Sequence, residues 1–136
     1  GYFNNKYIPR AGYSKNTTEL NYENNYRYIR YADVLLMAAE ANNRGGISDS
    51  KAQSYLNQVR SRAGVSSVNE TGSALTQAIW DERRLEFAGE GHRFFDLVRT
   101  GQAANEISGF VAGKHEVFPI PQTEIDISGL TQNPGY

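Results

Sequence analysis

The 136 residues carry 14 Lys and Arg against 15 Asp and Glu, a formal net charge of −1, and no cysteine. This near-neutral balance gives no electrostatic reason to expect nucleic acid or an anionic membrane surface as a partner. Without cysteine there is no disulfide framework and no thiolate chemistry. No apolar run is long enough to span a bilayer, and the length suffices for one modest core.

The first 28 residues are rich in tyrosine and asparagine and show no helical period, so we expect an extended segment and an exposed loop. Tyrosine rings beside asparagine amides suit a sugar, which offers apolar C–H faces and hydroxyl groups. If this part of the chain binds a ligand, the predicted contacts are Tyr13, Tyr22, Asn24 and Tyr26. The alternative is that these rings cover the helices as half-buried packing.

Two helices joined by a short loop are predicted next. Residues 30–44 are apolar over most of the helical circumference, which indicates a largely buried helix, and Gly45-Gly46 ends it. Residues 49–63 carry an apolar face at helical spacing, with Ser48 or Asp49 as the N-cap. Together they predict an antiparallel helical hairpin, the unit of tetratricopeptide-like arrays.

The stretch from Ala74 to Gly101 concentrates bulky apolar side chains and charges. We predict a helix from Ala74 to about Ala88, with Ser73 as its N-cap. One stripe of this helix carries Leu75, Ala78, Ile79, Glu82, Leu85 and Glu86. Two carboxylates therefore fall on an apolar face.

A buried carboxylate is costly unless it is paired and hydrogen-bonded, so Glu82 and Glu86 should bind arginines. The candidate partners include Arg60, Arg62, Arg93 and Arg99. Glycines at 89 and 91 predict a turn, after which a short helix runs from His92 to Arg99. We expect the two helices to pack around an ionic seam.

The same region admits catalytic and metal-binding interpretations. On a helix, the carboxyl groups of Glu82 and Glu86 can lie within roughly 6 Å, near the separation that retaining glycosidases use. That chemistry needs both groups to face an open cleft. The candidate ligands of a metal site would be His92 and Asp96, with Glu90 or His115 added. With two histidines in all and no other ligand cluster, we predict no metal site, and we expect His92 to hydrogen-bond Asp96 or a backbone carbonyl.

After Gly101, residues 102–114 are weakly patterned and predict a short helix and a turn. Residues 115–120 read as extended, because Pro119 and Pro121 hold the backbone in extended or polyproline conformation. We expect the final residues to lie along the helices without regular structure. No linker or low-complexity tract interrupts the chain, which predicts a single unit over 1–136.

Four runs of the chain resemble the C-terminal part of the SusD/RagB family and occur in the family's order. They are RYADVLLMAAEANNRGG, YLNQVRSRAG, DERRLEFAGEGHRFFDLVRTG and FPIPQTEIDISGLTQNPGY. The resemblance implies an all-α fold of tetratricopeptide-like helical hairpins with long irregular connecting and terminal segments. It also implies a longer protein, whose N-terminal part and lipid anchor lie outside this C-terminal region.

Family members are surface-exposed, glycan-binding outer-membrane lipoproteins of Bacteroidetes-type bacteria. The resemblance therefore implies a non-enzymatic protein without cofactor, which captures oligosaccharide or another nutrient and delivers it to a TonB-dependent transporter of the SusC type. We further predict that a structural ionic network ties the core through Glu82, Arg83, Glu86, Arg93, Asp96 and Arg99. The alternatives are a helical-repeat protein–protein interaction module without glycan contacts and, more distantly, a glycoside hydrolase that uses Glu82 and Glu86.

Overall fold

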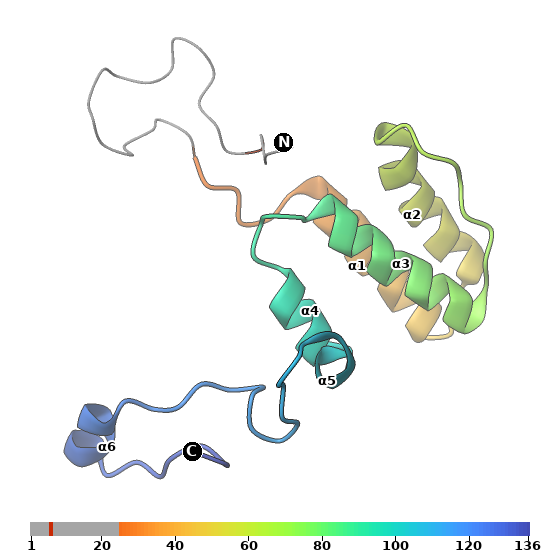
Figure 1. The fold of residues 1–136 in the computed structure, drawn as a ribbon. Helices are drawn as coiled ribbons and strands as arrows, with labels where there is room; N and C mark the ends of the chain where they lie inside the picture. The colour runs from red at the N-terminus through yellow and green to blue at the C-terminus, as the bar shows by residue number, and fades with distance from the viewer. Residues whose placement is uncertain (1–5, 7–24) are drawn as a thin grey trace, which may run out of the picture. The chain divides into compact units, whose positions relative to one another are not determined.

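The computed structural model describes residue 6 and residues 25–136, and the regular structure in this part of the chain is entirely helical (Figure 1). The all-α prediction is therefore confirmed. The described residues up to Gly89 form one compact unit, and Glu90–Tyr136 form a second. The first unit contains α1 (Tyr31–Arg44), α2 (Asp49–Arg62) and α3 (Gly72–Glu86); the second contains α4 (Arg93–Arg99), α5 (Ala103–Glu106) and α6 (Gln122–Ser128). The expectation of one folding unit over 1–136 stays a prediction.

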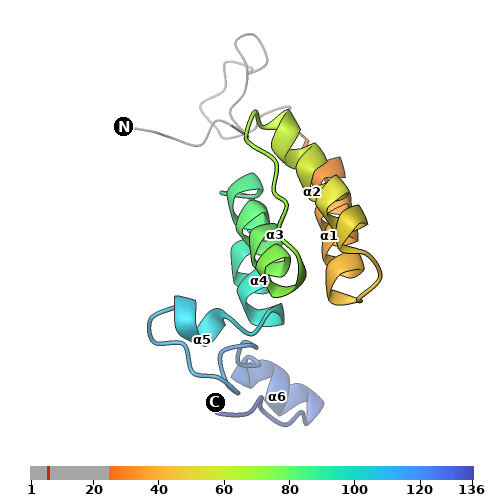
Figure 2. The same ribbon diagram turned by 90° about the vertical axis from the view of Figure 1, so that its right-hand side faces the viewer.

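In the first unit, α1 and α2 lie side by side and antiparallel, and α3 packs against both (Figure 1, Figure 2). The glycine pair ends α1 as predicted, with Gly46 in the left-handed region at a φ of 65°. Ser48 begins α2, since its Oγ accepts a hydrogen bond from the backbone N–H of Lys51 at 3.2 Å. The predicted helical hairpin is confirmed.

The core of this unit consists of side chains that the three helices turn toward one another. Its members are Leu35, Leu36, Ala39, Ala52, Leu56, Val59, Leu75, Ile79 and Phe87. Most of them follow the helical spacing that the sequence shows. The core therefore lies between α1, α2 and α3, where their apolar stripes meet.

The predicted burial of the apolar residues of α3 and α1 is partly wrong. Leu85 is 69% exposed, because it sits at the edge of the α3 stripe, beyond the side that meets α1 and α2. The helix α1 is not buried all round, since Tyr31, Val34 and Met37 are exposed on its surface. Apolar side chains at the margin of a helical stripe are thus left uncovered within the described part of this unit.

The predicted cap of the third helix is also wrong. The helix α3 begins at Gly72, with Thr71 rather than Ser73 at the N-cap position, and the Thr71 side chain makes no capping hydrogen bond. Instead, a carboxylate oxygen of Asp49 accepts a hydrogen bond from the backbone N–H of Gly72 at 2.7 Å. The other oxygen accepts from the Asn43 amide, also at 2.7 Å. The Asp49 carboxylate at the start of α2 therefore accepts the hydrogen bond that caps the start of α3. No local sequence pattern indicates this long-range pairing.

These two hydrogen bonds predict a pH dependence of stability. The Asn43 amide and the Gly72 N–H hold the pKa of Asp49 below its ordinary value. Because the folded-state pKa is lower than the unfolded one, the ionised group stabilises the fold above about pH 4, and this contribution is lost as the pH falls through the folded-state pKa. We expect Asp49→Asn to lower the melting temperature at pH 6 and to flatten its decline between about pH 5 and pH 2. A parallel decline in both proteins, measured by circular dichroism, would contradict this assignment.

The second unit has little buried apolar surface. Of its described hydrophobic side chains, only Leu97 and Ala103 are buried. The short helix expected after Gly101 is present as α5. The expectation that the final residues lack regular structure is wrong, because Gln122–Ser128 form α6, with Pro121 before its start and Gly129 in the left-handed region after its end. A helix of two turns is too short to show an apolar period in the sequence.

Candidate functional site

Glu82 of α3 is bound by an arginine of α2. Its side chain is buried, and its Oε2 lies 2.6 Å from Nη1 of Arg60. The same guanidinium donates through Nε to the carbonyl oxygen of Ser66, at 2.7 Å, in the loop that follows α2. Arg60 thereby joins α2, this loop and α3. The pair has the short, charge-assisted geometry that makes a buried carboxylate tolerable.

Glu86, one turn further along α3, has arginine partners at both carboxylate oxygens. Oε1 lies 2.6 Å from Nη1 of Arg30, which directly precedes α1, and Oε2 accepts from Nη2 of Arg62 at the end of α2. Arg30 also donates to the backbone carbonyl of Glu86 at 3.0 Å, and Lys6 donates to the same carbonyl. The C-terminal end of α3, where its carbonyls lack helical partners, is thus surrounded by cations.

A third pair ties α3 to α1. Nη1 of Arg83 lies 2.6 Å from Oδ1 of Asp33, and the two side chains are only 7% and 10% exposed. The Arg83 guanidinium also lies 5.1 Å from the centroid of the Phe87 ring, and that of Arg30 lies 4.9 Å from it. Arg83 is one of the residues of the predicted network, whereas Asp33 and Arg30 were not predicted as partners. The signal in the sequence that could have identified Asp33 as a partner was its charge on an otherwise apolar helix.

The other three residues of the predicted network lie in the second unit. Nη2 of Arg93 is 3.3 Å from a carboxylate oxygen of Glu106, and Nε of Arg99 is 2.8 Å from Oδ1 of Asp96, within α4. These pairs are more exposed than the Arg60–Glu82 and Arg83–Asp33 pairs, and exposed pairs contribute little to stability. That all six residues form one network stays a prediction.

Of the four predicted ligand contacts, Tyr26 is the one that lies within the described residues. Tyr13, Tyr22 and Asn24 lie outside the described residues. Tyr26 is 56% exposed and meets Tyr28 edge to face, with ring centroids 5.0 Å apart. Within residue 6 and residues 25–136, no group of three or more His, Cys, Asp or Glu side chains is arranged to hold a metal ion.

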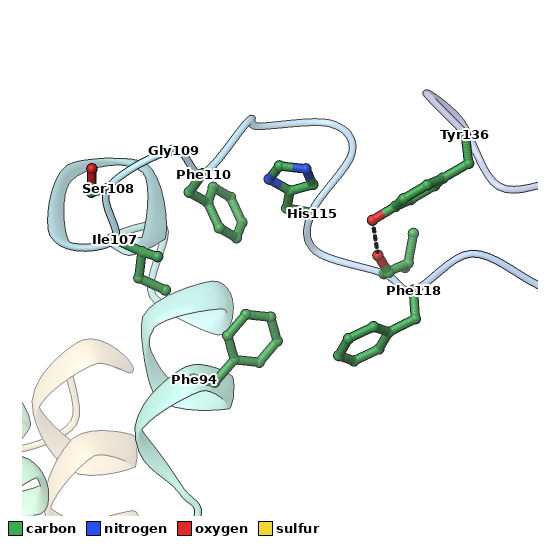
Figure 3. Close-up of a pocket in the computed structure, with 9 residues that line it drawn as sticks. Phe94, Ile107, Ser108, Gly109, Phe110, His115, Phe118 and Tyr136 are labelled. Atoms are coloured by element: carbon green, nitrogen blue, oxygen red, sulfur yellow. Dashed lines mark hydrogen bonds between the residues drawn. The ribbon is translucent and has the colours of Figure 1, made fainter.

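A pocket lined largely by aromatic rings, which we call the aromatic pocket, lies in the second unit (Figure 3). It has a volume of about 260 Å³ and is lined by Phe94, Ile107, Ser108, Gly109, Phe110, His115, Val117, Phe118 and Tyr136. Phe94 and Phe118 face each other with ring centroids 6.3 Å apart, and His115 contacts both Phe110 and Tyr136. This pocket was not predicted from the sequence, because its rings come from separate stretches of the chain, from α4 to the C-terminal residue.

Side-chain amides hold one wall of the aromatic pocket in place. The Gln132 amide bonds both backbone groups of Ile120, accepting from its N–H at 2.8 Å and donating to its carbonyl at 2.9 Å. The Asn133 amide donates to the carbonyl of Phe118 at 2.6 Å. These bonds clamp the FPIP run to the TQNPGY run and satisfy backbone groups that no regular structure pairs.

The helical hairpin, the third helix packed on it and the arginine–carboxylate pairs define an all-helical, tetratricopeptide-like scaffold. The chain belongs to the SusD family, whose model matches residues 1–136. The resemblance inferred from the four sequence runs is thereby confirmed.

Individual relatives agree with this assignment. The chain is 33% identical to SusD-like protein P2 of Formosa agariphila, over 96% of this chain and 30% of that protein. Its structure is similar to a SusD homolog from Bacteroides thetaiotaomicron, with a TM-score of 0.71 and 37% identity over 78% of this chain and 24% of the other. It is also similar to surface glycan-binding protein A from Bacteroides uniformis, with a TM-score of 0.68 and 40% identity over 83% and 28%. The chain thus spans less than a third of the length of these relatives.

Proposed function

We propose that residues 1–136 belong to a surface protein that binds a glycan or another nutrient at the outer membrane and delivers it to a TonB-dependent transporter of the SusC type. The observation that carries this proposal is the family match over the whole chain, together with 40% identity to a protein described as surface glycan-binding. None of the helices in residues 25–136 is long and apolar enough to cross a membrane. We propose attachment through a lipid anchor outside these residues.

In this proposal, the first unit is a scaffold rather than a reaction centre. A retaining glycosidase needs two carboxyl groups that face substrate in an open cleft. Here Glu82 is bound by Arg60, and Glu86 is bound by Arg30 and Arg62. Arg60 binds one carboxylate oxygen of Glu82, and arginines bind both carboxylate oxygens of Glu86, so these oxygens are engaged in ion pairs instead of facing substrate and water. This arrangement supports a non-enzymatic role and weighs against the hydrolase alternative.

Calorimetric titration of the full-length protein with oligosaccharides tests the binding role directly. We expect saturable heat with at least one oligosaccharide class, and copurification of a TonB-dependent transporter from the outer membrane. Copurification without measurable glycan binding would favour the protein–protein interaction module instead. Turnover of a chromogenic glycoside that disappears in Glu82→Gln would contradict the non-enzymatic role.

The predicted ligand contacts Tyr22 and Tyr26 give a more specific prediction. If Tyr22 and Tyr26 stack on sugar rings, each contributes about 1 kcal/mol, and the Tyr22→Ala, Tyr26→Ala double variant should bind about 30-fold more weakly. Tyr31→Ala provides the matched control, because Tyr31 is an exposed tyrosine at the start of α1 outside the proposed contact set. The same titration measures both variants. Unchanged affinity in the double variant would show that Tyr22 and Tyr26 do not bind the oligosaccharide.

A further inference from the structure

The chain between α2 and α3 runs back along α2 (Figure 1). Gly64, in the left-handed region at a φ of 75°, reverses the direction of the backbone just after α2. Residues 65–71 have no regular structure, and most of them are exposed. A polar stretch of this kind ordinarily belongs to the flexible part of a protein. Here its backbone is held at every second residue.

Four side chains of α2 hold this stretch, which we call the strap and define as residues 66–72. They lie on one stripe of the helix, because their spacing of four, four and three residues returns to the same face. They are Asp49, Gln53, Asn57 and Arg60. Their partners are the backbone groups of Gly72, Glu70, Val68 and Ser66, in that order. Alternate residues of the strap therefore face α2, as the period of an extended chain requires.

The central contact of the strap is doubled. The Asn57 amide donates to the carbonyl of Val68 at 2.9 Å and accepts from its N–H at 2.8 Å. On either side, the longer side chains of Gln53 and Arg60 each donate to a strap carbonyl, at 2.8 Å and 2.7 Å. A step of three or four residues along a helix rises about 4.5–6 Å, whereas two extended residues span about 6.5 Å, and the longer outer side chains bridge this difference.

Both ends of the strap are tied to the other helices of the first unit. At one end, Asp49 also accepts from the Asn43 amide of α1 at 2.7 Å. At the other end, Nη1 of Arg60 lies 2.6 Å from Oε2 of Glu82, the buried carboxylate of α3. The guanidinium that holds the strap is thus the one that pairs with Glu82.

The contacts of the strap depend on one another. Fixing the backbone of each residue costs conformational entropy similar in size to the net contribution of one hydrogen bond. One contact alone therefore cannot hold the residues between itself and the next contact, and the set is stable only together. If the strap leaves α2, Arg60 also loses the backbone acceptor that orients it toward Glu82.

We propose that the strap opens and closes as one unit, with Asn57 as its central latch, and that its opening loosens the Arg60–Glu82 pair. The strap is then a conformational device of the first unit, because it couples an exposed stretch of chain to a buried ion pair of α3. This inference does not rest on nutrient binding, so it and the proposed function can fail separately.

Hydrogen exchange of the unmodified full-length protein tests the single opening. The N–H groups of Val68 and Gly72 both donate to side chains of α2. We expect both amides to exchange at least tenfold more slowly than their intrinsic rates, with protection factors within fivefold of each other, because one opening exposes both. Mass spectrometry with electron-transfer fragmentation resolves the two amides. An unprotected Val68, or protection factors more than fivefold apart, would overturn the proposal.

Proteolysis tests the latch. A glutamate-specific protease can cleave after Glu70 only when the strap has left α2, because Gln53 holds the carbonyl of Glu70. In the full-length protein we expect Asn57→Ala to accelerate this cleavage at least tenfold. The matched control is Gln58→Ala, since the Gln58 amide donates to the carbonyl of Ser54 within α2 at 3.3 Å, and its rate should stay within twofold of the parent. Equal rates for the two variants would refute the role of Asn57.

Glu82→Gln tests the coupling to the ion pair. Loss of the charge weakens the hold on Arg60, so we expect cleavage after Glu70 to accelerate at least threefold. Asp81→Ala is the control, because Asp81 is exposed on α3 and accepts from Gln77, and its rate should be unchanged. If Glu82→Gln loses helix content by circular dichroism, Glu82→Asp, which keeps the charge but shortens the side chain, replaces it. Cleavage at the parent rate would show that the strap and the ion pair are independent.

Discussion

Asp33→Ala should lower the free energy of unfolding by about 3 kcal/mol, because it removes one partner of a buried ion pair. The substitution leaves the Arg83 guanidinium, which is almost fully buried, without the carboxylate 2.6 Å away. The desolvation of that charge was offset by the Coulomb attraction and hydrogen bond that Asp33 supplied. Urea unfolding followed by circular dichroism measures the change.

Two further variants separate this effect from a general loss of charge. Asp81 is exposed on α3 and accepts from Gln77 at 3.0 Å, so Asp81→Ala should change stability by no more than about 0.5 kcal/mol. The double variant Asp33→Leu, Arg83→Met replaces the pair with apolar side chains and should recover most of the lost stability. An Asp33→Ala protein as stable as the parent would show that this pair does not tie α1 to α3.

Leu56→Ala should destabilise the first unit by about 2–5 kcal/mol, since it removes a fully buried side chain and leaves a cavity. Leu56 lies on α2 in the core that the three helices share, so little backbone movement can fill the space. The matched control is Leu56→Met, which keeps the volume and should cost less than about 1.5 kcal/mol. Equal midpoints for the two variants in urea would contradict the assignment of Leu56 to the core.

The ion pairs of α3 and the hydrophobic core hold the same three helices by different means. Burial of leucine, isoleucine and valine is non-directional and supplies most of the driving force for packing. Arginine–carboxylate pairs are directional, so they contribute less net stability but restrict which faces of the helices meet. We infer that Asp33, Glu82 and Glu86 fix how α3 is seated on the hairpin.

The helical part of the fold was largely predictable from the sequence. The apolar residues around Leu36, Leu56 and Ile79 predict three helices, and glycines mark the ends of the first two. The need of Glu82 and Glu86 for cationic partners also follows from their positions among apolar residues. These features depend on contacts within one or two helical turns, which the sequence displays directly.

The second unit was much less predictable. Its short helix α6 escaped detection because two turns cannot display a period, and the Gln132 amide bonds have no local sequence signature. The aromatic pocket combines rings that lie as far apart in the chain as Phe94 and Tyr136. Rings scattered over loops meet only when the backbone between them has folded.

By itself, the sequence determined where the helices of the first unit form, which faces are apolar, and that two carboxylates on α3 require arginines. Only the tertiary structure decided that Glu86 binds Arg30, 56 residues away, that Arg83 binds Asp33, and that Leu85 stays exposed. The physical reason is the range of the interactions. Helix formation depends on neighbours three and four residues apart, whereas a buried charge is paired by whichever helix face the packed core brings within hydrogen-bonding distance.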